Sequence, residues 1–136
     1  KATPSLQSSN IPSNERDSIK EFAVPLGDQG NVSCYIEPLK STDIHLVVIG
    51  TLNGSIVIVS TQKRKIINRF KDAHSTAITA VSSGWVESGR DRYPLILSAD
   101  SNGTVAVSVY RKGEILLLDR KQSSITNVMT LRCLEN

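Results

Sequence analysis

Cysteine, aromatic residues and long apolar runs are all scarce in this sequence. Aromatic residues make up 4% of its 136 residues, and hydrophobic residues as a whole make up 39%. No apolar run approaches the roughly 18–20 residues that a membrane-spanning helix needs. The sequence therefore predicts a chain that is not an integral membrane protein.

The sequence contains two cysteines, Cys34 and Cys133. A secreted module stapled by disulfides usually carries more cysteines, at regular spacing. We therefore expect two free thiols and an intracellular, reducing compartment, either the cytoplasm or the nucleus. The net charge of +3 permits an acidic partner but does not require one.

Motifs for catalysis and for metal or cofactor binding are also missing. The sequence has two histidines, His45 and His74, and contains no metal-ligand pattern such as Cys-x-x-Cys or His-x-x-x-His. The sequence has no Gly-x-Ser-x-Gly nucleophile elbow and no Gly-rich phosphate loop. It therefore predicts no enzyme, no metal site and no cofactor in this segment.

Residues 1–30 are rich in Ser, Pro, Asn and charged side chains. Such a composition buries too little apolar surface to offset the entropy of the chain, so we interpret it as a flexible lead-in or linker. The short stretch Ile19–Leu26 has the composition of a strand, although Pro25 weakens that interpretation.

From residue 31 onward the sequence consists of short β-type runs divided by turn signals. Asn53-Gly54, Asn102-Gly103 and Lys112-Gly113 are dipeptides that supply the positive φ of tight turns. Since no convincing helical stretch occurs, the sequence predicts an all-β fold. The expected strands are Val32–Ile36, Leu46–Ile49, Ser55–Ser60, Ile66–Phe70, Ile78–Ser82, Leu95–Ser98, Thr104–Tyr110, Glu114–Leu118 and Ile125–Leu131.

An internal repeat organises these runs, because residues 46–58 align without a gap with residues 95–107, 49 residues later. Each copy contains an apolar strand, an Asn-Gly turn, an alternating strand, a basic turn and a further strand, and a short strand precedes it. Four antiparallel strands per unit are typical of propeller blades. The sequence predicts a β-propeller portion with two blades, at about 31–71 and 77–119, and a third that starts near residue 125.

The repeat resembles the WD-repeat family over residues 31–136. Asn53-Gly54-Ser55-Ile56 and Asn102-Gly103-Thr104-Val105 are similar to the family's Asp-Gly-Thr-Val turn, and Asp72-Ala73-His74 is similar to the Gly-His that precedes a blade. The family's Trp-Asp pair is replaced by Val59-Ser60 and Ser108-Val109. The resemblance therefore implies a degenerate propeller, without the polar tetrad that links many blades of that family.

A β-sandwich also shows short alternating strands, but the ungapped repeat favours propeller blades. Two blades do not close a ring and would leave open sheet edges. We therefore expect the remaining blades to come from the rest of a longer polypeptide or from a partner chain.

Basic residues recur in turns that a propeller places on one face. Lys63 and Arg64 occupy the turn before the fourth expected strand of the first blade, and Arg111 and Lys112 occupy the same turn of the second. Together with Arg90 and Arg92, which lie in a polar insertion at residues 84–93, they form a candidate docking face for RNA, acidic lipid or an acidic protein segment. The alternative is that these are solvated turn residues.

Trp85, in the same insertion, is either an interface anchor or a side chain that packs back onto the blade. Structural roles are expected at the turns and at the blade junction. His74 is expected to bond a turn backbone, and Asp100 is expected to accept hydrogen bonds from its own turn. The residues of this structural group are Asn53, Gly54, His74, Asp100, Asn102 and Gly103.

The resemblance implies a non-catalytic protein-interaction scaffold, a propeller portion of a subunit in a larger complex of proteins. Two alternatives stay open. One is a nucleic-acid-associated subunit of an RNA-processing assembly that uses the basic face. The other is the propeller of a membrane-trafficking or tethering complex, with proteins and acidic lipids as partners.

Overall fold

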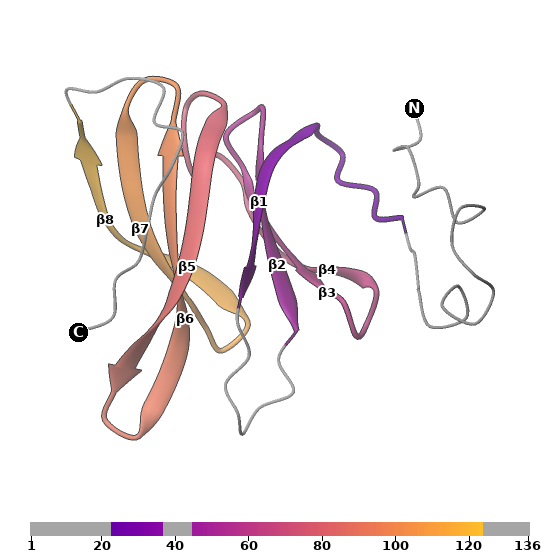
Figure 1. Cartoon of the computed structure of the whole chain (residues 1–136), viewed down its shortest axis with the longest axis vertical. Coiled ribbons are helices and arrows are strands. Elements are labelled where there is room, and N and C mark those ends of the chain that lie inside the picture. The colour runs from indigo at the N-terminus through magenta and orange to yellow at the C-terminus, as the bar shows by residue number, and fades with distance from the viewer. Residues whose placement is uncertain (1–22, 37–44, 124–136) are drawn as a thin grey trace, which may run out of the picture.

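The computed structural model describes residues 23–36 and 45–123, and all regular structure there is β (Figure 1). This confirms the predicted all-β class. No helix in these two ranges is long and apolar enough to cross a membrane. The expected strand Ile125–Leu131 and the first 22 residues of the expected lead-in lie outside the described residues. The strands are β1 (Gly30–Ile36), β2 (Leu46–Thr51), β3 (Ile56–Ser60), β4 (Lys65–Phe70), β5 (Ile78–Ser88), β6 (Asp91–Asp100), β7 (Thr104–Arg111) and β8 (Glu114–Gln122).

The strands form two antiparallel sheets with the same topology. Sheet A has the order β1-β2-β3-β4, and sheet B has the order β5-β6-β7-β8. Within each sheet, strands that are consecutive in the sequence pair with each other, as short turns require. Both sheets also contain a bulge between their third and fourth strands, at Ile58/Val59 and at Val107/Ser108. The repeat in the sequence is therefore a repeat of one four-stranded unit.

The turn between the second and third strands of each sheet contains the predicted Asn-Gly dipeptide. In sheet A the Thr51 N–H donates to the Ser55 carbonyl at 3.0 Å, so this turn is wider than a two-residue hairpin. Its glycine adopts φ +86°, and Gly103 of sheet B adopts φ +84°. Glycine suits these positions because side chains disfavour the left-handed region.

The β5–β6 hairpin replaces the polar insertion that was expected at residues 84–93. Strand pairing continues from Ser83↔Ile96 to Ser88↔Asp91, where the chain reverses at Gly89 and Arg90. The expected strands ended before this insertion, but paired strand backbones need no apolar composition to stay in register, so β5 and β6 continue through it. The hairpin therefore extends sheet B beyond sheet A (Figure 1).

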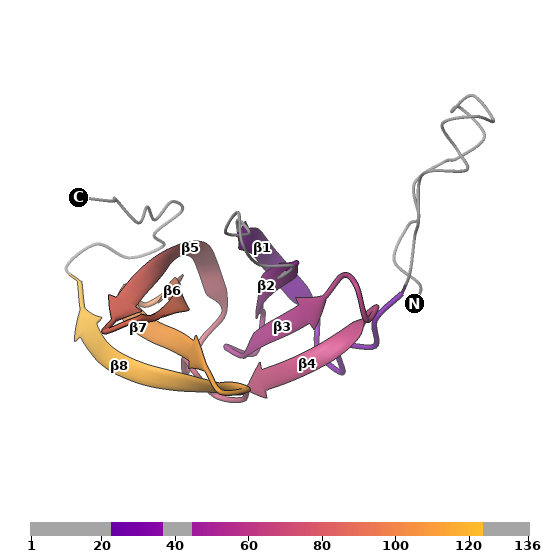
Figure 2. The same ribbon diagram turned by 90° about the horizontal axis from the view of Figure 1, so that it is seen from below.

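The two sheets pack face to face, and β1 of sheet A lies beside β5 of sheet B (Figure 2). Each fully buried aliphatic side chain at such a contact contributes about 1.5–3 kcal/mol. Two hydrogen bonds tie the strands further, since Asn31 donates to the Ile78 carbonyl at 2.7 Å and Ser83 donates to the Tyr35 carbonyl at 2.9 Å. The shared core consists of Ile36, Leu46, Val48, Ile56, Ile58, Ala73, Ile78 and Ile96.

Gly50 allows the close approach of the two sheets. A Cβ atom at this position would overlap with Cγ2 of Ile78 and lie 2.9 Å from its Cβ, well inside van der Waals contact. The backbone of β2 at Gly50 is thus in direct contact with Ile78, the first residue of β5. Any side chain here would push sheet B away from sheet A.

Candidate functional site

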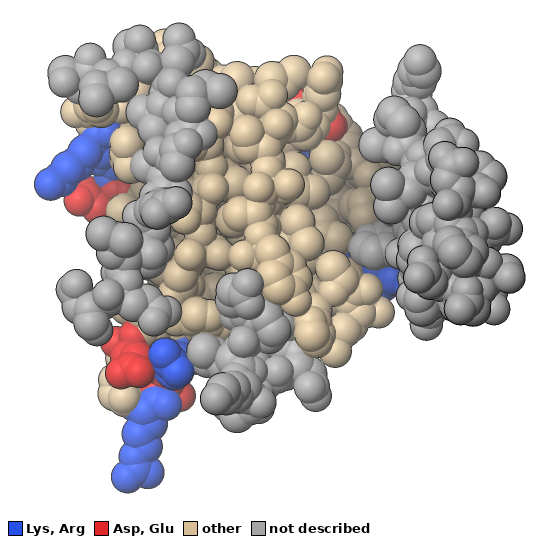
Figure 3. Space-filling view, viewed as in Figure 1, with Lys and Arg blue, Asp and Glu red and all other residues tan. Residues whose placement is uncertain are grey.

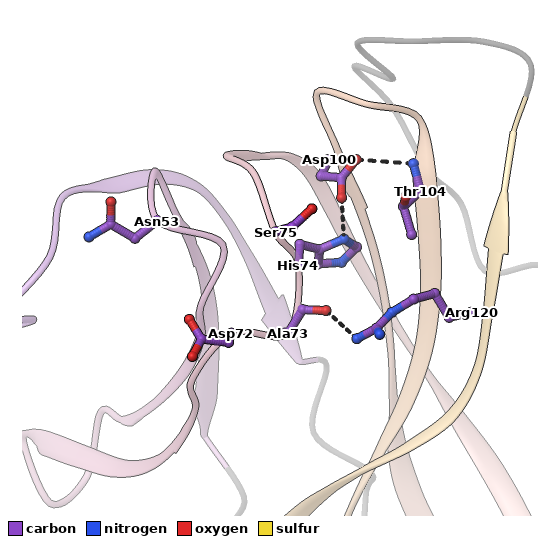
Figure 4. A pocket seen from close by; sticks show the side chains of 8 residues that line it. All are labelled: Asn53, Asp72, Ala73, His74, Ser75, Asp100, Thr104 and Arg120. Atoms are coloured by element: carbon purple, nitrogen blue, oxygen red, sulfur yellow. Dashed lines mark hydrogen bonds and ion pairs between the residues drawn. The ribbon is translucent and has the colours of Figure 1, made fainter.

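A polar pocket opens between the two sheets, at the end that carries the β2–β3 and β6–β7 turns (Figure 4). Its volume is about 390 Å³. The connection between β4 and β5, residues 71–77, runs along it and links sheet A to sheet B. The residues that line the pocket are Asn53, Asp72, Ala73, His74, Ser75, Asp100, Thr104 and Arg120.

His74 joins the connection to both sheets through hydrogen bonds. Its backbone N–H donates to the Gly54 carbonyl of sheet A at 2.9 Å. Its imidazole lies 2.9 Å from Oδ2 of Asp100 through Nδ1 and 2.7 Å from Oγ of Ser98 through Nε2. All three side chains are buried. The resemblance implies that the family's polar tetrad is missing, yet a buried network of three side chains forms at this junction.

The partners of the imidazole define its protonation. A carboxylate only accepts, so Nδ1 of His74 carries the proton that is donated to Asp100, and in the neutral ring Nε2 accepts from the Ser98 hydroxyl. Burial lowers the pKa of His74, against the opposing effect of Asp100, which raises it; the positive charge of Arg120 lowers it further. The histidine is therefore neutral at pH 7, in agreement with its acceptor role toward Ser98.

Asp100 has a second role in its own turn. Its Oδ1 accepts hydrogen bonds from the backbone N–H groups of Asn102 at 2.9 Å and Thr104 at 3.0 Å. The same carboxylate thus shapes the β6–β7 turn and orients His74. In sheet A, Thr51 occupies the equivalent place, where its hydroxyl accepts from the Ser55 N–H at 2.9 Å.

Ser98, His74 and Asp100 have the order of contacts of a nucleophile, base and orienting acid. Their environment argues against such chemistry, because the exposed fraction of Ser98 is 0% and Ser98 does not line the pocket. A substrate carbonyl cannot reach its hydroxyl oxygen without separation of the sheets. The arrangement therefore acts as a buried hydrogen-bond network that fixes the junction.

Arg120 closes the network from the last strand of sheet B. Its guanidinium donates to the carbonyl of Ala73 in the connection between the sheets (Figure 4). Asp72, next to Ala73, is exposed at the rim of the pocket with φ +59°. The pocket thus presents a carboxylate and a guanidinium on either side of the connection, which suits polar groups of a binding partner.

The predicted basic residues lie at the opposite end of the molecule. Lys63 and Arg64 are in the β3–β4 turn, Arg90 is in the β5–β6 turn, and Lys112 is in the β7–β8 turn. These turns all lie in the lower half of Figure 1. The structure therefore brings the basic turns to one end of the two sheets.

Two of the predicted basic residues have local partners there. Arg92 forms an ion pair with Glu87 at 3.3 Å, and Arg111 lies over the ring of Tyr93 at 4.9 Å. Figure 3 shows acidic and basic side chains mixed at the tip of the β5–β6 hairpin, at the lower left. The hairpin tip is therefore a mixed-charge surface.

Trp85 and the other predicted residues have structural surroundings. Trp85 is half-buried and packs against the shared core of the two sheets. Asn53 and Asn102 are exposed at their turns, while Gly54 and Gly103 are buried there.

Cys34 is a free thiol on β1, and Cys133 lies outside the described residues. Burial raises the pKa of the Cys34 thiol, which a hydrogen bond with Ser83 opposes.

Two important residues of the pocket and network, Ser98 and Arg120, were not predicted as site residues. Ser98 and Asp100 are two positions apart in a strand, so they share one face, and this spacing was an available signal. Arg120 gave no signal, because its contact with Ala73 depends on how the sheets pack. No group of His, Cys, Asp and Glu among the described residues is arranged to hold a metal ion.

Comparison with models of known protein families and with curated protein sequences finds no match to this chain.

Proposed function

We propose that this chain is part of a β-propeller similar to WD-repeat proteins and acts as a non-catalytic protein-interaction scaffold within a larger assembly. One observation carries the proposal: two sheets of the same strand order pack through their first strands and repeat the same turn contacts. Leu52 N–H donates to the Gln29 carbonyl at 2.8 Å, and Ser101 N–H donates to the Ala77 carbonyl at 3.0 Å. In both units, the residue that follows the second strand thus donates to the residue that precedes the first strand.

A rigid repeat of this kind supports binding surfaces without chemistry. The turns at both ends of the sheets display polar side chains on a frame held by the shared core and by the His74 network. The burial of Ser98 favours a scaffold over a hydrolase.

The test is to isolate the natural polypeptide under native conditions and measure its intact mass and the mass of its complexes. A propeller of seven blades needs on the order of 300 residues. We expect either a polypeptide well above 14.8 kDa or a stable partner that completes the ring, and in both cases a complex of fixed stoichiometry. A monomer of 14.8 kDa that forms no complex would contradict the proposal.

A second candidate function is RNA binding, favoured because the turns that carry Lys63, Arg64 and Lys112 lie at the same end of the two sheets. Binding through phosphate contacts weakens linearly on a logarithmic scale as the salt concentration rises. We expect Arg64→Glu with Lys112→Glu to abolish such binding, whereas Lys121→Glu, an exposed residue near the other end, changes it little. An RNA affinity that changes neither with the salt concentration nor with these substitutions would contradict this function. The absence of RNA binding would contradict it as well.

A further inference from the structure

Sheet B has an outer face that points away from sheet A. Leu95 and Leu97 alternate along β6 with Ile96, which belongs to the core shared with sheet A. Side chains of a strand alternate between faces, so the two leucines point the other way. Cross-strand pairing adds Val105 and Val107 of β7 and Leu116 of β8 to the same face. We call these five residues the outer face.

The outer face repeats the surface with which sheet A binds sheet B. Four aliphatic residues of β2 and β3, the two central strands of sheet A, belong to the shared core. Each has an aliphatic counterpart 49 residues later, at the same register position of sheet B, and all four counterparts lie on the outer face. The matched pairs are Leu46 with Leu95, Val48 with Leu97, Ile56 with Val105, and Ile58 with Val107.

The small residue that receives an incoming strand is repeated too. Gly50 of sheet A pairs with Ile56 and supports Ile78 of β5. Ala99 occupies the corresponding position of sheet B, opposite Val105. Alanine is the smallest residue with a side chain, so both sheets carry a small, buried residue at this position.

The chain also leaves both sheets by the same route. After β4, the His74 N–H donates to the Gly54 carbonyl at 2.9 Å, and four residues later β5 begins against sheet A. After β8, the Ser123 N–H donates to the Gly103 carbonyl at 2.8 Å. Residue 123 thus stands where residue 74 stands in the preceding unit, at the same separation of 49 residues.

We propose that the outer face of sheet B is a docking surface for a third four-stranded sheet, and that residues 125–131 of this chain form its first strand. This inference rests on the proposed propeller architecture and identifies the surface and its occupant. The segment supplies apolar residues for the contact, namely Ile125, Val128, Met129 and Leu131. Hydrophobic association of matched aliphatic surfaces drives the docking, as it does between sheets A and B.

The third sheet must differ from sheet B at one point of contact. Asn68 of β4 pairs with Ile58 and donates to the carbonyl of Gly113 in sheet B. Asp119 holds the matching position on β8, paired with Val107. A carboxylate accepts and does not donate, so the third sheet offers Asp119 a donor in place of a backbone carbonyl.

Paramagnetic relaxation in the full chain tests the docking. A nitroxide is attached at position 127 through the substitution Asn127→Cys, in a background with Cys34→Ser and Cys133→Ser. We expect several-fold stronger broadening of the methyl signals of Leu97 and Val107 than of Val57, which lies in sheet A. Replacement of Ile125 and Val128 by serine should remove the difference, while the signals of Ile58 and Ile96 stay in place as markers of intact packing.

Two outcomes would overturn the inference. One is equal broadening of all three probes in the folded protein. The other comes from a mixture of two kinds of chain, one that carries the nitroxide but no isotope and one that carries the isotope but no nitroxide. Broadening in this mixture would mean that the segment of a second copy occupies the face. Either result leaves the partner-binding test of the proposed scaffold unchanged, so the failures of the two proposals are distinguishable.

Discussion

At the scale of single residues, His74 determines how the two sheets are joined. It is buried, neutral and bonded to Ser98 and Asp100, and its backbone reaches Gly54 of the other sheet. A satisfied buried network of this kind holds one arrangement, since removal of any member leaves a polar group unpaired at a cost of about 1–3 kcal/mol. The burial of this network affects both the pH dependence of stability and the reactivity of Ser98.

The free energy of unfolding should fall as the pH drops below 6.5. Burial lowers the pKa of His74 from the ordinary value of 6.5, so the unfolded chain takes up a proton at a higher pH than the folded chain. The unfolded state then binds more protons, and stability decreases by at most about 1.4 kcal/mol per pH unit for one such group. Urea titrations at a series of pH values measure the slope. His74→Gln should have lower stability and a smaller slope below pH 6.5; an unchanged slope would contradict the assignment.

Ser98 should not react with a fluorophosphonate probe in the folded protein. Its exposed fraction is 0%, so the probe cannot approach the hydroxyl although His74 lies within hydrogen-bond distance. Mass spectrometry of the treated protein should show no adduct on Ser98, and Ser98→Ala should give the same spectrum. An adduct that depends on His74 would instead establish a reactive serine.

At the scale of elements, the turns carry most of the local constraints. Gly54 and Gly89 both have positive φ, +86° and +65°. Their surroundings differ: a Cβ at Gly54 would overlap with the carbonyl oxygen of His74, whereas a Cβ at Gly89 meets nothing within 4 Å. The two glycines therefore separate the cost of the backbone conformation from the cost of a clash.

Gly89→Ala should lower the free energy of unfolding by about 1–2 kcal/mol, the cost of a left-handed residue with a side chain. Gly54→Ala should cost more, because it also displaces the connection that carries His74. Urea unfolding of the two variants gives the comparison. Equal losses would mean that the β2–β3 turn adjusts freely and does not anchor the connection.

At the scale of the whole molecule, the packing of sheet A on sheet B is the central feature. Gly50 and Ile78 touch across this contact, and both sheets contribute to one core. Since neither sheet buries its facing residues alone, we expect the two sheets to unfold together.

Gly50→Ala should destabilise the protein by about 1–3 kcal/mol, as overpacking of a core does. Ile78→Ala alone should cost about 2–5 kcal/mol. The double variant should be more stable than the sum of the two losses predicts, by about 0.5–3 kcal/mol, because removal of Cγ2 makes room for the new Cβ. Gly50→Ala with Leu116→Ala, a residue that is 41% exposed on β8, is the additive control. Additivity in both pairs would contradict the close contact.

The sequence by itself determined the all-β class, the four-stranded unit and its repetition. These depend on local signals, namely alternation in runs such as 104–110 and glycine at positions of positive φ such as Gly54 and Gly103. It did not determine the β5–β6 hairpin, because strand pairing there is polar and leaves no apolar pattern to recognise. Tertiary structure alone decided that Ser98, His74 and Asp100 meet, and that Arg120 reaches Ala73, since these contacts join residues of different strands and of the connection. Such contacts depend on the distance and orientation of two packed sheets, which no local pattern encodes.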